Sequence, residues 1–377
     1  MNYGKYLMEN SLQIKPYTPE LEPLVKEFNV RLRQGGETYW AFPESHVPRL
    51  PKVANENPYQ EFFLTCDGGA VRGGYLLTHS EFVVRGETTR IACGPQLNMS
   101  EALVNRCYGI IGALNVRDAV KRQPLLYGLG MGGFEQPQTK ILSSMRWPLR
   151  AVPFFFKVLN APRFLANINY LRETGGGRLM LDLGRYTGLG SMAAKVVQFR
   201  PGNRNGATAE LCHEFDDWAD ENWARCKRRY RLVAVRNKET LNRLYPCKDS
   251  RFLRLRVSRG GRLLGWAVLL DTQMSGHKQF GHMRVGSIVD CLAEPEDASA
   301  IVQSSSTLLE RRGVDLIVSN QTSSAWCRAF IASGFVRGPT NFIQALSPAL
   351  ASRLEPLPES WGEMHLNRGD GDGPIHL

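Results

Sequence analysis

The alternation of hydrophobic and polar positions predicts a regular series of strands and helices in the first half of the chain. Glycines interrupt an alternating stretch from 59 to 84, which predicts two strands around a turn. Apolar residues recur at helical spacing from 102 to 123, and the apolar run from Pro124 is typical of a buried parallel strand. The predicted order is a hairpin at 59–84, a strand at 88–97, a helix at 102–123, a strand from 124, a helix from 137 and a strand at 150–159.

The second half of the chain repeats this order with different residues, so the repeat is one of architecture. The predicted elements are a hairpin at 251–272, a strand at 283–295, a helix at 296–313, a strand at 314–321, a helix at 322–335 and a strand at 340–348. Two modules with a boundary near residue 200 follow from this repeat, and a tail rich in proline and glycine occupies 351–377.

Composition narrows the class of protein and leaves the partner open. Hydrophobic residues make up 43% and charged residues 22% of 377, which excludes a wholly disordered, collagen-like or coiled-coil chain. The net charge of +11 favours an anionic partner, such as a nucleic acid, a membrane surface or a phosphorylated cofactor. A solvated basic surface explains the charge equally well.

The cysteines, the histidines and the most apolar stretch indicate the compartment of the protein, whether it binds a metal and whether it crosses a membrane. The 8 cysteines form no C-x-x-C pair, which predicts free thiols in a reducing cytoplasm. The 7 histidines lack the spacing of a metal site. Charged residues and a proline interrupt the apolar stretch 151–171, so we expect a core strand and a helix there and no transmembrane segment. A peripheral membrane contact by this stretch stays open.

The repeated strand–helix–strand units at 124–158 and 314–346 carry a resemblance to a known fold. Together with the segments MRW at 145–147 and SGF at 333–335, they resemble two GNAT (acyl-CoA N-acyltransferase) modules in tandem, as in FemAB-like proteins. The resemblance implies an α+β (mixed α/β) fold with modules at 1–200 and 201–350, each a central mixed sheet flanked by helices. It also implies acyl transfer to an amine or hydroxyl, for instance of an amino sugar in polysaccharide synthesis.

The resemblance further implies where an acyl donor would bind. In the GNAT fold one strand offers its backbone to the pantetheine arm, and the loop after it holds the pyrophosphate. The matching loops here, near 97–104 and 291–300, lack the glycines of the family pattern and carry acidic residues. A carrier-linked donor such as aminoacyl-tRNA is therefore an alternative to acetyl-CoA or another acyl-CoA. The implied donor-binding residues are Ser100, Asn105, Val289, Cys291, Leu292 and Ser323. Ser100 could instead cap a helix.

Candidate catalytic residues lie on or after predicted strands. Asp290 interrupts an apolar strand, where a carboxylate is costly unless paired, and is the first candidate for a general base. An Asp that pairs with an arginine is the alternative. Asn320 and Gln321 follow a buried strand and could orient the acyl carbonyl, or form ordinary loop hydrogen bonds. Tyr127 could act as an acid, or be a half-buried strand aromatic.

The C-terminal tail contains two further titratable residues that are candidates for catalysis. His365 and Asp370 would join the acid–base set if the tail docks, whereas a frayed tail is the alternative.

Three functions are compatible with the sequence, and it favours an acyltransferase. A non-catalytic tandem GNAT-fold scaffold in envelope biosynthesis is the second hypothesis. A nucleic-acid binder is the third, with the basic stretch 223–236 as its only candidate surface.

Overall fold

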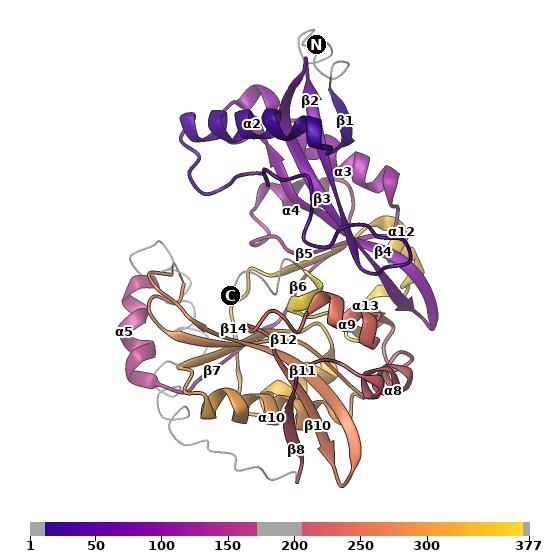
Figure 1. The fold of residues 1–377 in the computed structure, drawn as a ribbon, viewed down its shortest axis with the longest axis vertical. Coiled ribbons are helices and arrows are strands. Elements are labelled where there is room, and N and C mark those ends of the chain that lie inside the picture. The colour runs from indigo at the N-terminus through magenta and orange to yellow at the C-terminus, as the bar shows by residue number, and fades with distance from the viewer. Residues whose placement is uncertain (1–11, 172–205, 278, 372–377) are drawn as a thin grey trace. The chain divides into compact units, whose positions relative to one another are not determined.

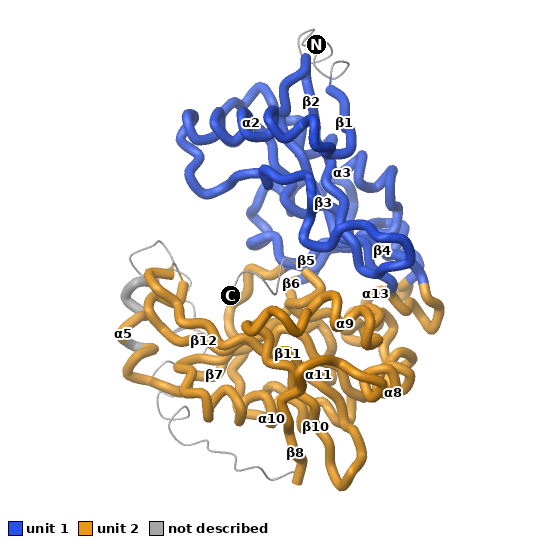
Figure 2. The backbone as a smooth tube through the Cα atoms, in the orientation of Figure 1, with its two compact units in different colours: residues 1–81, 89–150, 343–353 blue, residues 82–88, 151–342, 354–377 orange. Residues whose placement is uncertain are grey.

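The chain folds into two compact units, each assembled from segments that are distant in sequence (Figure 1). The structure is a computed structural model that describes residues 12–171, 206–277 and 279–371. Figure 2 shows unit 1, residues 1–81, 89–150 and 343–353, and unit 2, residues 82–88, 151–342 and 354–377. The boundary that the sequence predicts near residue 200 lies outside the described residues.

Unit 1 is built on a mixed sheet with the strand order β1-β2-β3-β4-β5-β15-β6. Its strands are β1 (Gln13–Pro16), β2 (Tyr59–Asp67), β3 (Ala70–Val84), β4 (Glu87–Ser100), β5 (Leu126–Gly130), β6 (Leu149–Ala151) and β15 (Ile343–Leu346). Its helices are α2 (Glu22–Gln34), α3 (Ile111–Arg122), α4 (Pro137–Ser144) and α12 (Pro348–Arg353). The pairing of β4 with β5 is parallel, whereas β15 pairs with β5 in the antiparallel direction.

Strand β2 shows how the alternating pattern produces two cores in unit 1. Successive side chains of a strand point to opposite faces of the sheet. Phe62 accordingly packs with Val25 and Phe28 of α2, whereas Phe63 packs with Val116 of α3 on the other face. The helices therefore cover both faces, as the α/β pattern of the sequence requires.

Unit 2 has the strand order β14-β7-β13-β12-β11-β10-β8. Its strands are β7 (Phe154–Val158), β8 (Thr208–Cys212), β10 (Leu253–Arg259), β11 (Arg262–Gln273), β12 (Arg284–Ala293), β13 (Leu316–Asn320) and β14 (Val336–Gly338). Its helices are α5 (Ala161–Leu171), α8 (Asp217–Cys226), α9 (Lys238–Leu244), α10 (Ala298–Arg311), α11 (Ser324–Ala332) and α13 (Leu357–Ser360). Two short strands, β9 (Leu232–Ala234) and β16 (Met364–His365), pair with each other, and β9 also pairs with the end of β3.

The two halves of the chain exchange strands, which the sequence did not predict. Strand β7 comes from the first half but lies between β14 and β13 in unit 2. Strand β15 comes from the second half and lies between β5 and β6 in unit 1. A single division of the chain into 1–200 and 201–350 therefore does not separate the compact units, because each sheet contains a strand from the other half.

Several predicted elements begin or end elsewhere than the pattern suggested. The helix expected at 102–123 begins at Ile111, because two short 3-10 turns at 101–103 and 106–108 precede it. The expected core strand and helix within 151–171 are present as β7 and α5. The tail from 351 packs through residue 371, so the docked alternative holds for that part.

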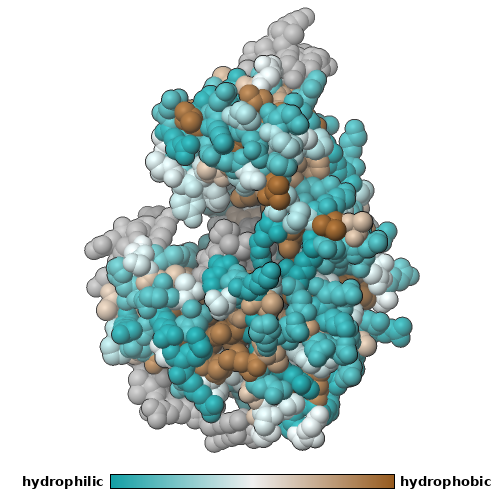
Figure 3. Space-filling model, viewed as in Figure 1, coloured by the Kyte–Doolittle hydropathy of each residue, from teal (hydrophilic) through white to brown (hydrophobic). Residues whose placement is uncertain are grey.

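The polarity of the surface and the character of the helices were compared with what a membrane-spanning protein requires. Hydrophilic side chains cover most of the face that Figure 3 shows. Within the described ranges, none of the helices combines the length and apolar character that a membrane crossing requires.

Candidate functional site

Strands β4 and β5 of unit 1 part after a short parallel pairing. Only Ala92 with Leu126 and Cys93 with Tyr127 are paired, and β4 then continues to Ser100. A strand edge without a neighbour has backbone groups that an extended ligand can pair with. We call this feature the β4–β5 divergence. No described segment of the chain forms a ladder with β4 there on the side of β5.

A network of buried and half-buried amides ties β4 to the helices α3 and α4. Asn98 on β4 donates to the carbonyl of Gly112 in α3 and to the side chain of Gln138 in α4. The buried Asn115 donates to the Asn98 side-chain oxygen over 2.8 Å and accepts a hydrogen bond from Thr65. These contacts hold β4, α3 and α4 together, because a buried amide that loses a partner is costly.

The loop after β4 satisfies its own polar groups. Ser100 accepts a hydrogen bond from the backbone of Ala102, and its hydroxyl donates to the carbonyl of Tyr108. Asn105 accepts from the backbone of Cys107. Ser100 therefore acts as the cap that the sequence left as an alternative, and its hydroxyl is not open to a phosphate. The side-chain NH2 group of the exposed Asn105 bonds to no described residue.

Glu101, the acidic residue of that loop, is buried between two arginines. Its carboxylate lies 3.2 Å from Arg31 and 3.1 Å from Arg72, and the residue is only 4% exposed. The two guanidinium groups compensate the negative charge, so this carboxylate repels a phosphate less than an unpaired one would.

Tyr127 lies on β5 at the last position that is paired with β4. It faces Cys93 on one side and Leu346 of β15 on the other, and it is 3% exposed. The residue is thus more buried than the half-buried strand aromatic that the sequence offered as an alternative. Its place at the point where the strands part keeps it a candidate for contact with a bound donor.

In unit 2 the equivalent strands also part, but the chain itself fills the space. β12 and β13 pair only at 285–287 with 316–318, although β12 continues to Ala293. The C-terminal segment 364–370 bonds to both strands beyond that point. Gln321 forms a backbone bridge with Asn367, and Thr322 donates from its backbone to the carbonyl of Leu366. We call this arrangement the filled β12–β13 divergence.

Asp290 takes part in a buried ion network within this divergence. One carboxylate oxygen lies 2.8 Å from Nε of Arg236 and 2.7 Å from the hydroxyl of Tyr245. The other oxygen accepts from the side chain of Asn367 at 2.9 Å. Asp290 is 1% exposed and both of its carboxylate oxygens have donors. It is therefore paired with an arginine, as the alternative to a general base in the sequence analysis required.

Asp370 reaches the same arginine from the C-terminal segment. Its carboxylate lies 2.5 Å from a terminal nitrogen of Arg236. Burial raises the pKa of Asp370 to about 6, with Arg236 opposing and Asp290 reinforcing the shift. Sequence reasoning missed Arg236, since its place in a basic stretch gave no sign that it would be buried between two acids.

His365 is enclosed by aromatic rings. It stacks on Tyr230 and Trp326 with ring centroids 4.7 Å and 5.3 Å away. Its Nε2 lies 2.7 Å from the carbonyl oxygen of Cys291, so this nitrogen carries the proton. Burial lowers the pKa of His365 to about 4, which keeps the ring neutral in the folded protein near neutral pH.

The remaining predicted residues of unit 2 lie around the same segment. Asn320 accepts from Arg368 at 3.2 Å, and the Gln321 side-chain amide lies 3.5 Å from the Cys291 sulfur. Val289 and Leu292 are fully buried on β12. The structure thus brings together Asp290, Asn320, Gln321, His365, Asp370, Val289, Cys291 and Leu292 in unit 2. Tyr127, Ser100 and Asn105 belong to unit 1, and Ser323 begins α11.

Comparisons with known proteins agree with this architecture. No family model matches the chain. No curated protein matches it either. Among solved structures, Saccharomyces cerevisiae N-myristoyltransferase with bound myristoyl-CoA is 11% identical, with 89% of this chain and 82% of that chain covered and a TM-score of 0.50.

Two bacterial structures are similar to the same extent. A probable N-acyltransferase from Enterococcus faecalis V583 is 10% identical, with 91% and 74% of the two chains covered and a TM-score of 0.52. A GCN5-related N-acetyltransferase from Anabaena variabilis is 9% identical, with 89% and 72% covered and a TM-score of 0.52. At sequence identities this low, the similarity shows that the folds are alike and does not show a shared activity. The chain has the mixed α/β fold of two tandem GNAT-like modules, and the FemAB-like type stays a prediction.

Proposed function

We propose that the protein is an acyltransferase whose donor, an acyl-CoA, binds at the β4–β5 divergence of unit 1. One observation carries the proposal: in a GNAT-like fold, β4 runs on to Ser100 after its pairing with β5 ends at Cys93 and Tyr127. An extended pantetheine arm can bond to such a strand edge in the manner of an added strand. The corresponding site of unit 2 is occupied by residues 364–370 of the chain itself.

The groups around this divergence fit the pantetheine arm of an acyl-CoA better than they fit its pyrophosphate. Backbone groups of β4 beyond Cys93 suit the amide-containing arm, whereas the Asn98 amide is already bonded to Gly112, Gln138 and Asn115. The Ser100 hydroxyl is bonded within its loop, so the pyrophosphate would depend on the Asn105 side-chain NH2 group, backbone N–H groups and nearby arginines such as Arg72. Tyr127 is proposed to donate a proton to the leaving thiolate, since it lies where the strands part.

The acceptor is proposed to be an amine or hydroxyl, with an amino sugar of an envelope precursor as the first class to assay. Acyl transfer to such an acceptor forms an amide or ester bond and breaks the thioester, and the thiol leaves with a proton. The filled β12–β13 divergence favours a second reading, in which the protein is a non-catalytic scaffold. A tRNA-linked donor is the further alternative if no acyl-CoA binds.

The test is thermal unfolding of the full chain with and without a panel of acyl-CoAs. A ligand at a hundred times its dissociation constant adds about 2.7 kcal/mol to the free energy of unfolding. A rise in the midpoint with one acyl-CoA, followed by transfer of its labelled acyl group to an amino sugar, is the expected result. Tyr127→Phe should keep the thermal shift and lower kcat, whereas Asn320→Ala, a matched change in unit 2, should leave the shift unchanged. No shift with any acyl-CoA would overturn the proposal.

A further inference from the structure

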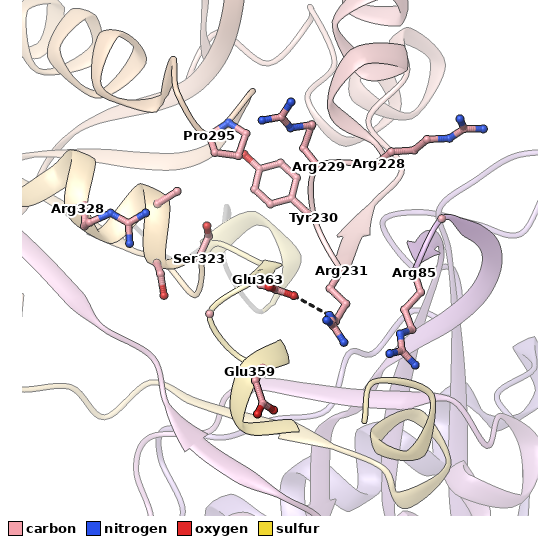
Figure 4. Close-up of a pocket in the computed structure, with 14 residues that line it drawn as sticks. Arg85, Arg228, Arg229, Tyr230, Arg231, Pro295, Ser323, Arg328, Glu359 and Glu363 are labelled. Carbon is pink, nitrogen blue, oxygen red and sulfur yellow. Dashed lines mark hydrogen bonds and ion pairs between the residues drawn. The ribbon is translucent and has the colours of Figure 1, made fainter. Parts of the chain in front are cut away.

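A basic cavity of unit 2 lies outside the sites described above. Its volume is about 730 Å³, which is within the range of small-molecule sites. The turn between β3 and β4, the loop after α8, the start of α11 and the chain around Glu363 form its walls (Figure 4). The arginines that line it are Arg85, Arg228, Arg229, Arg231 and Arg328.

Three of these arginines have no partner in the described part of the chain. No ion pair or hydrogen bond engages the side chains of Arg85, Arg228 or Arg328, and all three are exposed. By contrast, Arg229 pairs with Glu296, and Arg231 bonds to Glu363 at 2.6 Å. A lining with several unpaired cations attracts anions.

The start of α11 adds further donors to the cavity. Ser323 is the N-cap, yet its side chain accepts no hydrogen bond from the helix. Its hydroxyl forms no hydrogen bond with any described residue, although the residue is only 2% exposed. Figure 4 shows Ser323 between Arg328 and Glu363. An uncapped helix start with an unpartnered hydroxyl beside it is suited to bind an anion.

Arg231 points to the same conclusion from the opposite wall. Its Nε bonds to Glu363, but its Nη1 is buried and has no hydrogen-bond partner. A buried cationic donor without a partner is unfavourable unless a ligand or water satisfies it. Two carboxylates, Glu359 and Glu363, also line the cavity, and Glu363 is already engaged by Arg231. The positive groups therefore remain in excess.

The walls of the cavity are fixed to one another by backbone contacts. Arg85 donates from its backbone to the carbonyl of Arg231, and Arg231 donates to the carbonyl of Glu363. Ser324 donates to the carbonyl of Gly362. These bonds hold together the backbone segments that carry the arginines before a ligand arrives, which lowers the entropic cost of binding.

We infer that this cavity binds a small molecule that carries a diphosphate group. Paired phosphates match several convergent guanidinium groups and helix N–H groups better than a single carboxylate does. The site is separate from the β4–β5 divergence of unit 1, so the inference does not depend on the proposed acyl transfer. The diphosphate can belong to a nucleotide or to another diphosphate ester.

Calorimetric titration of the full chain with inorganic pyrophosphate tests the shared chemistry, and titration with ADP tests a nucleotide source. We expect saturable binding of pyrophosphate that weakens as salt is added. Arg328→Ala combined with Arg85→Asn should weaken it by at least about tenfold, because charge-assisted hydrogen bonds to two arginines are lost. Asparagine is chosen because it tolerates the positive φ of 50° at residue 85. Arg337→Ala, on an exposed arginine of β14 outside the cavity, is the matched control and should bind as the wild type does.

A second variant separates loss of the site from loss of the fold. Ser324→Glu places a carboxylate in the first turn of α11, where it favours the helix but repels an anion. We expect an unchanged or higher unfolding midpoint together with loss of pyrophosphate binding. Absence of saturable binding in the wild type, or wild-type affinity in both Ser324→Glu and the double variant, would overturn the inference. Tighter binding of ADP than of pyrophosphate would support a nucleotide, and equal binding would support recognition of the diphosphate alone.

Acyl-CoA binding provides the comparison with the proposed function. CoA also carries a diphosphate, so the thermal shift with acyl-CoA is measured in the same variants. An acyl-CoA shift that survives in Ser324→Glu while pyrophosphate binding is lost would support two separate sites. Loss of both together would overturn the separation. Failure of every acyl-CoA to bind, with pyrophosphate still bound, would overturn the proposed function and leave this site standing.

Discussion

The side-chain amide of Asn367 donates to the carboxylate of Asp290 over 2.9 Å, although the residues are 77 positions apart. This contact fastens the C-terminal segment to β12, on the side where a parallel neighbour is missing beyond Ser287. In unit 1 the corresponding strand β4 receives no such segment among the described residues. The two modules therefore share a fold, and the residues that the structure describes close the divergence in only one of them.

Removing the Asn367 amide should destabilise unit 2. Asn367→Ala leaves one buried oxygen of Asp290 without its donor, which costs about 1–3 kcal/mol. Urea unfolding followed by tryptophan fluorescence measures this difference in the free energy of unfolding. Asn341→Ala is the matched control, because Asn341 is exposed and should change stability by less than about 0.5 kcal/mol. Equal stability of Asn367→Ala and wild type would show that the segment is not held by this contact.

Arg236 should be far more sensitive than a surface arginine. Arg236→Gln leaves Asp290 and Asp370 as neighbouring buried acids without a cation, at a cost of about 3–5 kcal/mol. Adding Asp370→Asn to that variant should restore part of the loss, since it removes one of the uncompensated charges. Arg251→Gln breaks an exposed pair with Asp249 and should cost less than about 1 kcal/mol. Similar losses for Arg236→Gln and Arg251→Gln in urea unfolding would contradict the buried network.

The sequence predicted the elements well because their signals are local. The hairpin at 251–272 was expected from its glycine turn and alternating residues, and the structure has β10 and β11 there. The helix expected at 322–335 is α11, and Pro137 opens α4 as predicted. The helix start at 111 was missed because Asn105 and Ser100 cap short turns instead, a choice that apolar spacing does not reveal.

Non-local features were out of reach of the pattern. Nothing in the apolar run of β7 tells that it joins the sheet of the other half, since any buried strand has that composition. Asp290 stood out because a carboxylate in an apolar strand needs a partner, but its partner Arg236 could not be named. The grouping of His365 and Asp370 with Asp290 required the tail to dock, which the sequence offered as one of two alternatives.

Glu101 provides a test of the loop that follows β4. Glu101→Gln removes the charge that compensates Arg31 and Arg72, so we expect a loss of about 1–3 kcal/mol in the free energy of unfolding. The loss stays moderate because both arginines can turn towards solvent, being 28% and 22% exposed. Glu44→Gln, whose pair with Arg33 is long and exposed, is the control and should be nearly neutral. The same order of loss in both variants would contradict a buried role for Glu101.

His365 and Asp370 should give opposite pH dependences to the stability of unit 2. The pKa of His365 falls from 6.5 to about 4 on folding, so the unfolded chain binds more protons between these values and stability rises with pH. The pKa of Asp370 rises from 3.8 to about 6, so the folded chain binds more protons in that window and stability falls with pH. In the wild type the two effects largely cancel between about pH 4 and 6.

Single substitutions should expose each effect in turn. With His365→Gln the Asp370 contribution is left alone, and the free energy of unfolding relative to wild type should fall as pH rises from about 4 to 6. With Asp370→Asn the His365 contribution is left alone, and the same difference should rise with pH across that range. Urea titrations at several pH values measure both slopes. Slopes of the same sign in the two variants would mean that at least one of these groups does not titrate as its burial requires, because the removed groups act in opposite directions.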